Sequence, residues 1–302
     1  RAINLMIKNL NFNKYYKLFN IISVVLVILS VLSILFKGLN YGVDFKGGTL
    51  IELRINDNQT TISNLRSAFN NMNLGDVAIK NFGNDNDYLI KFVKKDRDKN
   101  LIQNIKTDLQ SSIGSVFEFR RVESVGPKVS AELLNKGLIA IAASLAAMLF
   151  YIWIRFEWQF SLGAIIALFH DVILTIGIFS LFNIEINLSI VAALLTIVGY
   201  SMNDTVVIFD RVRENLKKHI SIKIFELTNI SINETLSRTI ITSATTLLAL
   251  LSIFIFGGEI LKGFSLAMIL GVIFGTYSSI YIANPTLVYL KVSYKTVVKE
   301  EK

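Results

Sequence analysis

The stretch NLSIVAALLTIVGYSMNDTVVIFDRVREN, residues 187–215, decides the architecture of this chain. Its first part is plain membrane material, and apolar residues continue as far as Phe209. Asn203 and Asp204 interrupt that apolar run side by side. An ionisable side chain inside a lipid-spanning helix is costly unless it has a partner or a function. We therefore predict a functional site at this point of a membrane span.

Composition extends this interpretation to the whole chain of 302 residues. Hydrophobic residues make up 52% and charged residues only 18%, which is typical of membrane proteins. Crossing a hydrocarbon layer of about 30 Å takes roughly 20 apolar residues. Six stretches are long enough, at 18–36, 138–154, 160–182, 188–209, 239–257 and 264–289. The predicted fold class is a membrane all-α protein with six transmembrane helices and an inserted extracytoplasmic α+β domain.

Three regions follow from these spans. Residues 1–36 form a cytoplasmic tail and the first span, 37–136 the inserted domain, and 137–302 a five-span bundle with a loop at 210–238. Positive charges gather at one end of the spans, where the tails and loops carry Arg1, Lys8, Lys14, Lys17, Arg155, Arg211, Arg213, Lys217, Lys218, Lys223, Arg238, Lys291, Lys295, Lys299 and Lys302. The short loops at the other end hold only Lys262. The positive-inside rule therefore predicts that both termini are cytoplasmic and that 37–136 is extracytoplasmic.

Several chemical classes are disfavoured by what the sequence lacks. It has no Cys and only two His, so we expect no thiolate or His-based metal site. It has neither GxxxxGK[ST] nor GxGxxG, so we expect no nucleotide cofactor and no enzyme activity. The basic stretch 210–219 most simply ends a helix and enforces its orientation, with contact to anionic lipid headgroups as an alternative role. It lacks stacking aromatics, so nucleic acid is not an expected partner, whereas membrane lipid is.

The insert has the order of a ferredoxin-like domain. Alternating residues predict strands at 49–55, within 77–82 and 88–93, and at 115–122, while helical periodicity predicts helices at 60–72 and 98–113. The resulting order is β-α-β-β-α-β. Two junctions join the insert to the spans: YGVDFKGGT, with Gly42, Asp44, Gly47 and Gly48, and the turn Gly126–Pro127. We interpret both as structural, with an anion or metal loop as the weaker alternative for the first.

Asp204 is the residue whose burial most needs an explanation. Ser201 shares its helix face, and Arg238 begins the fifth span from the same end of the bundle. A run of hydroxyl residues, which includes Ser243, follows Arg238. A carboxyl that alternates between an arginine partner and a proton is the basic part of a proton relay. A static ion pair that only orients two helices would use the same residues, so both interpretations stay open.

Two other features lie inside spans. His170 and Asp171 are neighbours near the middle of the third span, and point about 100° apart on a helix. They are therefore not expected to face one partner. Either one lines a polar path while the other hydrogen-bonds a neighbouring helix, or both are packing residues with satisfied hydrogen bonds. In the sixth span, small residues recur every fourth position and predict a close helix-packing seam, at Ala267, Gly271, Gly275, Ser279 and Ala283. That seam is also a candidate sliding surface.

These motifs together resemble a known family. GYSMNDTVVIFDRVREN, YGVDFKGGT, VGPKVSAELL, LSRTIITSATTLLALL and GTYSSIYIANP are similar to motifs of the SecF family, which belongs to the resistance-nodulation-division superfamily. The resemblance covers nearly the whole chain. It implies pairing with SecD in a bacterial inner membrane, and association with the SecYEG translocon and its accessory subunits.

The resemblance also implies a function. Such a complex uses the proton motive force to assist export of unfolded polypeptides, and its acidic fourth-span residue and fifth-span arginine match Asp204 and Arg238. Ser201, Asn203, Ser243, His170 and Asp171 are secondary proton-path candidates. Two alternatives remain: a scaffold that holds SecD and passively chaperones exported chains, and half of a small-molecule or lipid exporter. The small insert argues against the exporter.

Overall fold

The structure is a computed structural model, which describes residues 10–56, 60–72, 74–93, 100–114 and 116–298. Four of the cations that predict the membrane orientation lie outside the described residues: Arg1, Lys8, Lys299 and Lys302. The chain divides into two compact units. One is the insert, residues 41–138, and the other joins residues up to 40 with those from 139 onward.

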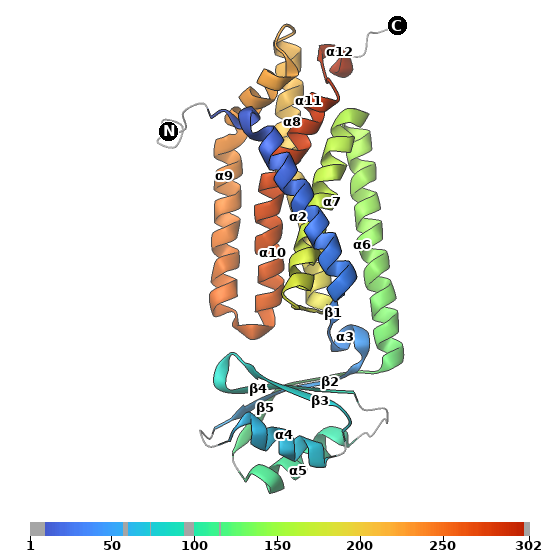
Figure 1. Cartoon of the computed structure of the whole chain (residues 1–302), viewed down its shortest axis with the longest axis vertical. Coiled ribbons are helices and arrows are strands. Elements are labelled where there is room, and N and C mark those ends of the chain that lie inside the picture. The colour runs from blue at the N-terminus through green and yellow to red at the C-terminus, as the bar shows by residue number, and fades with distance from the viewer. Residues whose placement is uncertain (1–9, 57–59, 73, 94–99, 115, 299–302) are drawn as a thin grey trace. The chain divides into compact units, whose positions relative to one another are not determined.

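Within the described residues, six helical segments are long and apolar enough to cross a membrane, as predicted (Figure 1). They are α2 (Tyr16–Lys37) preceded by the 3₁₀ helix η1 (Phe12–Tyr15), α6 (Pro127–Arg155), α7 (Trp158–Leu181), α8 (Leu188–Lys218), α9 (Ile224–Phe256), and α10 (Gly258–Ser278), which continues through the π-helix η2 (Ser279–Ala283) into α11 (Asn284–Tyr289). The short α12 (Tyr294–Val297) follows, and the two-residue strands β1 (Asn40–Tyr41) and β6 (Glu185–Ile186) lie between helices in the sequence.

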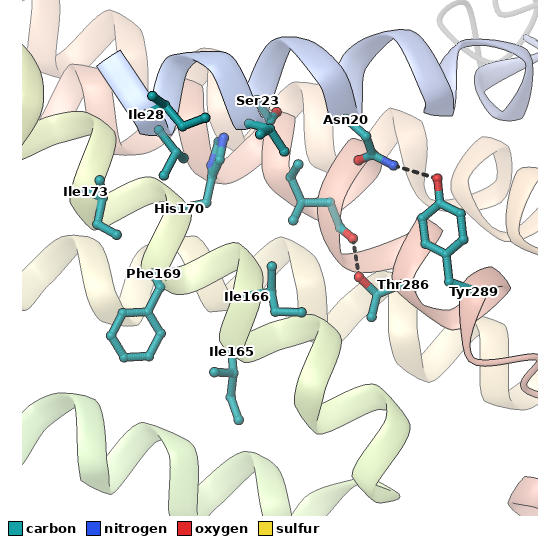
Figure 2. Close-up of a pocket in the computed structure, with 13 residues that line it drawn as sticks. Asn20, Ser23, Ile28, Ile165, Ile166, Phe169, His170, Ile173, Thr286 and Tyr289 are labelled. Carbon is teal, nitrogen blue, oxygen red and sulfur yellow. Dashed lines mark hydrogen bonds between the residues drawn. The ribbon is translucent and has the colours of Figure 1, made fainter. Parts of the chain in front are cut away.

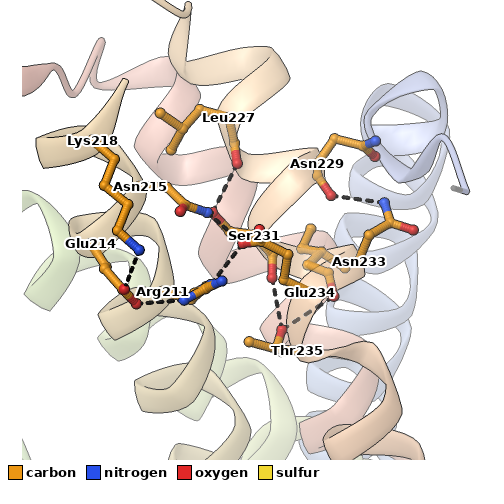
Figure 3. Close-up of polar contacts among 11 residues, drawn as sticks. Arg211, Glu214, Asn215, Lys218, Leu227, Asn229, Ser231, Asn233, Glu234 and Thr235 are labelled. Atoms are coloured by element: carbon orange, nitrogen blue, oxygen red, sulfur yellow. Dashed lines mark hydrogen bonds and ion pairs between the residues drawn. The ribbon is translucent and has the colours of Figure 1, made fainter. Parts of the chain in front are cut away.

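The loop expected at 210–238 is mostly helix instead. α8 runs on to Lys218 and α9 begins at Ile224, so only residues 219–223 connect them. Ion pairs explain the extension, because Arg211 and Lys218 both bind Glu214 at helical spacing, with N···O distances of 2.6 Å. Arg211 also reaches Glu234 on α9, and Asn215 donates to the same carboxylate (Figure 3). These contacts hold the two helices together beyond their apolar segments.

The insert has the ferredoxin-like topology that the sequence predicts. Its elements are α3 (Val43–Lys46), β2 (Gly48–Ile55), α4 (Ile62–Asn71), β3 (Val77–Phe82), β4 (Asn84–Phe92), α5 (Leu101–Ile113) and β5 (Phe117–Val125). The antiparallel sheet has the order β3-β4-β2-β5. Helices α4 and α5 cover one face (Figure 1), where Leu65, Phe69, Ile105 and Leu109 pack against Ile51, Leu53 and Ile90. The apolar residues that alternate along the strands and those that recur with helical period therefore pack together in one core.

Gly47, which follows α3, and Gly48, which begins β2, adopt backbone conformations that require glycine, whereas Gly42 does not. Gly47 and Gly48 have φ of +76° and +130°, which side chains rarely adopt, whereas Gly42 has an ordinary φ of −73°. A Cβ on Gly47 would lie 3.1 Å from Ser130 Oγ and 3.3 Å from Pro127 Cα. The glycine pair thus lets the α3–β2 corner approach the start of α6, which begins at Pro127 directly after Gly126.

We expect Gly48→Ala to destabilise the insert, because its Cβ would lie 2.7 Å from Phe92 O at a φ of +130°. The expected cost is about 1–3 kcal/mol. Limited proteolysis of the full chain measures it as faster cleavage within 41–138. Gly126→Ala is the matched control, since its Cβ would have no neighbour within 4 Å. Equal cleavage rates for the two variants would contradict the conformational argument.

Candidate buried carboxylate site

Asp204 lies on α8 with only 4% of its surface exposed. Its Oδ2 accepts hydrogen bonds from Ser243 Oγ of α9 at 3.4 Å and from Thr276 Oγ1 of α10 at 3.3 Å. The two hydroxyls are themselves 2.7 Å apart. A buried carboxylate needs such partners, because it would otherwise lose the solvation of water without compensation. Three helices therefore converge on one carboxyl group.

Arg238 does not make the direct contact that its sequence position suggests. Its side chain is exposed, and within the described residues its guanidinium forms no ion pair or hydrogen bond. It lies near enough for its charge to act on Asp204 through space. The reason is helical phase: Arg238 and Ser243 are five residues apart, so they point about 140° apart on α9. Ser243 faces Asp204, and Arg238 consequently faces away from it.

Asp171 forms a second and more deeply buried carboxylate site. It is fully buried on α7, and its Oδ2 accepts from Ser201 Oγ of α8 at 2.6 Å and Ser278 Oγ of α10 at 2.7 Å. Its Oδ1 lies 2.8 Å from His170 Nδ1. The neighbouring residues thus pair with each other, because the imidazole turns back towards the adjacent carboxylate. The 100° separation of their positions does not keep the two side chains apart.

His170 extends this cluster towards α2. Its ring stacks on Tyr277 with centroids 5.8 Å apart, and Tyr277 in turn shares a hydrogen bond of 2.7 Å with Ser23. Tyr277 also donates to the carbonyl of Phe19 at 2.9 Å. The second site therefore connects α2, α7, α8 and α10.

A short segment of α10 supplies both sites. Thr276 donates to Asp204 and Ser278 donates to Asp171, two residues further along. The π-helix η2 starts immediately afterwards, and Asn284 Nδ2 donates to the carbonyl of Ser279 at 2.7 Å within it. Single π-turns inside α-helices are frequent at functional sites. Sequence reasoning assigned no role to Thr276, Tyr277 or Ser278, although three successive hydroxyl side chains in an apolar span are a usable signal.

The other sequence-predicted residues divide between the two sites and their surroundings. Ser243 joins Asp204, whereas Ser201 joins Asp171 rather than the acid on its own helix face. Asn203 belongs to neither site, because its side chain is exposed and points about 100° away from that of Asp204 on α8. In the part of the chain that the structure describes, no group of three or more His, Asp or Glu side chains could hold a metal ion. In both sites the contacts that the structure shows are hydrogen bonds.

Close packing of α10 on α8 brings these groups together. A Cβ on Gly271 would lie 2.3 Å from Ile197 Cγ1, and one on Gly275 would lie 2.9 Å from Ser201 Cα. Neither position has room for a side chain. The small residues of the sixth span thus allow the two backbones to approach closely.

The fold and these sites define a polytopic membrane protein that buries two carboxylates among hydroxyl groups. A family model described as "Protein export membrane protein SecD/SecF, C-terminal" matches residues 105–293. Another, described as "SecD/SecF GG Motif", matches residues 32–57 and so includes Gly47 and Gly48. The chain belongs to the SecD/SecF family of protein-export membrane proteins, and its similarity is to the SecF subunits.

Individual relatives agree with this assignment. The chain is 48% identical over 251 residues to "Protein translocase subunit SecF" of Rickettsia bellii (strain OSU 85-389), covering 82% of each sequence. It is 44% identical over 264 residues to the SecF subunit of Cereibacter sphaeroides, covering 84% of this chain and 81% of that one. Among solved structures, SecDF from Thermus thermophilus superposes with a TM-score of 0.84 at 35% identity. That match covers 93% of this chain and 38% of the longer SecDF chain.

We expect Gly275→Ala to separate α10 from α8, because the added Cβ meets the backbone of Ser201 rather than a flexible side-chain end. The expected cost is about 1–3 kcal/mol of stability. Thermal denaturation of the purified chain in mild detergent measures it. Gly199→Ala is the matched control on α8, where a Cβ has no neighbour within 4 Å. A Gly275→Ala protein as stable as Gly199→Ala would show that the seam tolerates separation.

Proposed function

We propose that this chain is the SecF subunit of an auxiliary translocase, driven by the proton motive force, that assists export of unfolded polypeptides. Its membership of the protein-export family supports a role in transport rather than in catalysis. The single observation that carries the proton-coupling part is Asp204, a buried carboxyl whose direct partners are two neutral hydroxyls. Hydroxyls can donate to a carboxylate and accept from a carboxylic acid, so this site suits both protonation states.

The coupling partner in this proposal is Arg238. It lies near Asp204 without contact, so the two can be apart in one state and paired in another. Proton uptake by Asp204 neutralises the carboxylate and removes its attraction to Arg238, and proton release restores that attraction. One charge that moves through 100 mV corresponds to about 2.3 kcal/mol. That energy is enough to shift a balance between two helix arrangements.

A polar route towards Asp204 begins at the end of the bundle where residues 219–223 connect α8 to α9. Thr239 lies one helical turn before Ser243 on α9, and its buried hydroxyl has no hydrogen-bond partner within the described residues. A water molecule at this hydroxyl would extend the path from Arg238 to Ser243 and Asp204. The proposal keeps Ser201, His170 and Asp171 as a secondary path, because they share α8 and α10 with the first site. Asn203 faces outward and would act only through a partner subunit.

The proposed setting follows the charge distribution and the family. Both termini are cytoplasmic, and residues 37–136 form the extracytoplasmic domain, in a bacterial inner membrane. The partners are SecD, the SecYEG translocon with its accessory subunits, the unfolded exported polypeptide and membrane lipid. The solved SecDF chain supports the SecD partner, because this chain aligns with only part of it.

The scaffold alternative is favoured by one observation: both carboxylates already have hydroxyl partners on neighbouring helices, and those of Asp171 are short, at 2.6 and 2.7 Å. In that case Asp204 and Arg238 would only orient helices. Loss of Asp204 would then weaken assembly with SecD instead of coupling.

We expect Asp204→Asn to abolish the part of preprotein translocation that a proton gradient stimulates. The amide keeps the size and hydrogen bonds of the carboxyl but cannot be protonated reversibly. Translocation into proteoliposomes, with the SecD-containing complex and the translocon, measures this as a fall to the rate seen without a gradient. Co-purification of SecD and an unchanged melting temperature establish that assembly is intact.

Asp210→Asn is the matched control, since Asp210 lies on the same helix in an exposed ion pair with Arg155. It should retain gradient-stimulated translocation. Full stimulation of the Asp204→Asn complex would exclude the relay, and loss of SecD from that complex would support the scaffold.

A further inference from the structure

A groove of about 550 Å³ opens between α2 and α7 and is closed at one end by η2 and α11 (Figure 2). Most of its lining is aliphatic, from Val24, Val27 and Ile28 on α2 and Ile165, Ile166 and Ile173 on α7. The volume and the apolar lining with few polar groups are typical of ligand sites between helices of a bundle. Because its walls belong to membrane-spanning helices, its apolar part matches a hydrocarbon chain.

The polar groups of the groove are graded along its length. Asn20 Nδ2 donates to the hydroxyl of Tyr289 at 3.1 Å at one end, with Thr286 beside them (Figure 2). Ser23 and His170 lie further along the groove, and the remaining length is apolar. The groove thus has a polar end, an intermediate polar level and an apolar level. A phospholipid has the same order of parts: a headgroup, the glycerol esters and the acyl chains.

His170 supplies the second and independent sign of a ligand. Only 5% of its surface is exposed, and its Nε2 is buried without a hydrogen-bond partner in the described part of the chain. His170 lines the groove, while its Nδ1 is occupied by Asp171. A carboxylate only accepts, so Nδ1–H donates to Asp171, and within the described residues Nε2 has no partner from the protein. This polar side chain belongs to the intermediate polar level of the groove, which corresponds to the glycerol-ester level of a phospholipid.

The charge at the polar end selects the headgroup. Lys17 is one turn before Asn20 on α2, and so continues the stripe of α2 residues that faces the groove. Lys291 follows Tyr289 by two residues. Both side chains are exposed, and within the described residues neither forms an ion pair. Two free cations at the headgroup level attract an anionic lipid and not a zwitterionic one.

We propose that the α2–α7 groove is a binding site for one anionic phospholipid. The headgroup lies near Lys17, Asn20 and Tyr289, the glycerol ester lies at the level of Ser23 and His170, and an acyl chain fills the apolar length. Through His170 the lipid contacts the Asp171 cluster directly. The site is defined by this chain alone and does not depend on the role proposed for Asp204.

Native mass spectrometry of the full chain, purified in mild detergent with any partner that accompanies it, tests the site. The probes are dioleoylphosphatidylglycerol and dioleoylphosphatidylcholine at equal concentrations. We expect the first bound molecule of dioleoylphosphatidylglycerol to be held more tightly than the first bound molecule of dioleoylphosphatidylcholine. Lys17→Gln should weaken that binding about fivefold, because a surface lysine contributes about 1 kcal/mol to anionic lipid attraction. Lys223→Gln, which removes an exposed cation in the connection between α8 and α9, should leave it unchanged.

Two further variants separate the parts of the lipid. Ile166→Trp fills the groove and should weaken both lipids, whereas Ile241→Trp on α9 should weaken neither; the two isoleucines are similarly exposed, at 43% and 44%. His170→Phe should also weaken both lipids, since both carry the ester. Equal binding of the two lipids to the unmodified protein would overturn the proposal. Equal effects of the two tryptophan variants would overturn it as well, and size-exclusion chromatography confirms that each variant is folded.

Discussion

Hydrogen bonding of buried carboxylates by hydroxyl groups is the interaction around which the membrane bundle is arranged. Asp171 and Asp204 come from adjacent helices, and each accepts from two hydroxyls on other helices. The hydrocarbon layer of a membrane holds no water to bind such groups, so their hydrogen-bond partners must come from the protein. The close approach of α10 to α8 at Gly271 and Gly275 makes this possible, because it brings Thr276 to Asp204 and Ser278 to Asp171.

This arrangement joins helix packing to the hydrogen bonds of the two carboxyls. A change in the charge of either carboxyl alters hydrogen bonds that run to α10, and α10 changes its winding at η2 directly beyond them. In the function proposed here, protonation of one of these carboxyls would favour a helix movement. The contacts between α8 and α9 beyond their apolar segments act in the opposite sense, since Arg211, Glu214 and Glu234 hold that end together (Figure 3). Movement would then concentrate near the carboxylates.

The α2–α7 groove places a candidate lipid against the same network. His170 binds Asp171 through Nδ1 and is also one of the residues that line the groove. Tyr277 and Ser23 complete the link from α10 to α2. A lipid bound in the groove would in this way be able to influence the Asp171 cluster from the bilayer.

The sequence by itself determined the six spans, the ferredoxin-like order of the insert and the need for a functional account of Asp204. These follow from length, periodicity and the cost of a charge in hydrocarbon, all of which are local properties. Only the tertiary structure decided which groups meet. Asp171 receives Ser201 and Ser278, and Asp204 receives hydroxyls while Arg238 faces away, because helical phase and the close contact of α8 with α10 set these pairings. Hydroxyl residues are common in the spans, and nothing in their spacing along the chain tells which will face an acid on another helix.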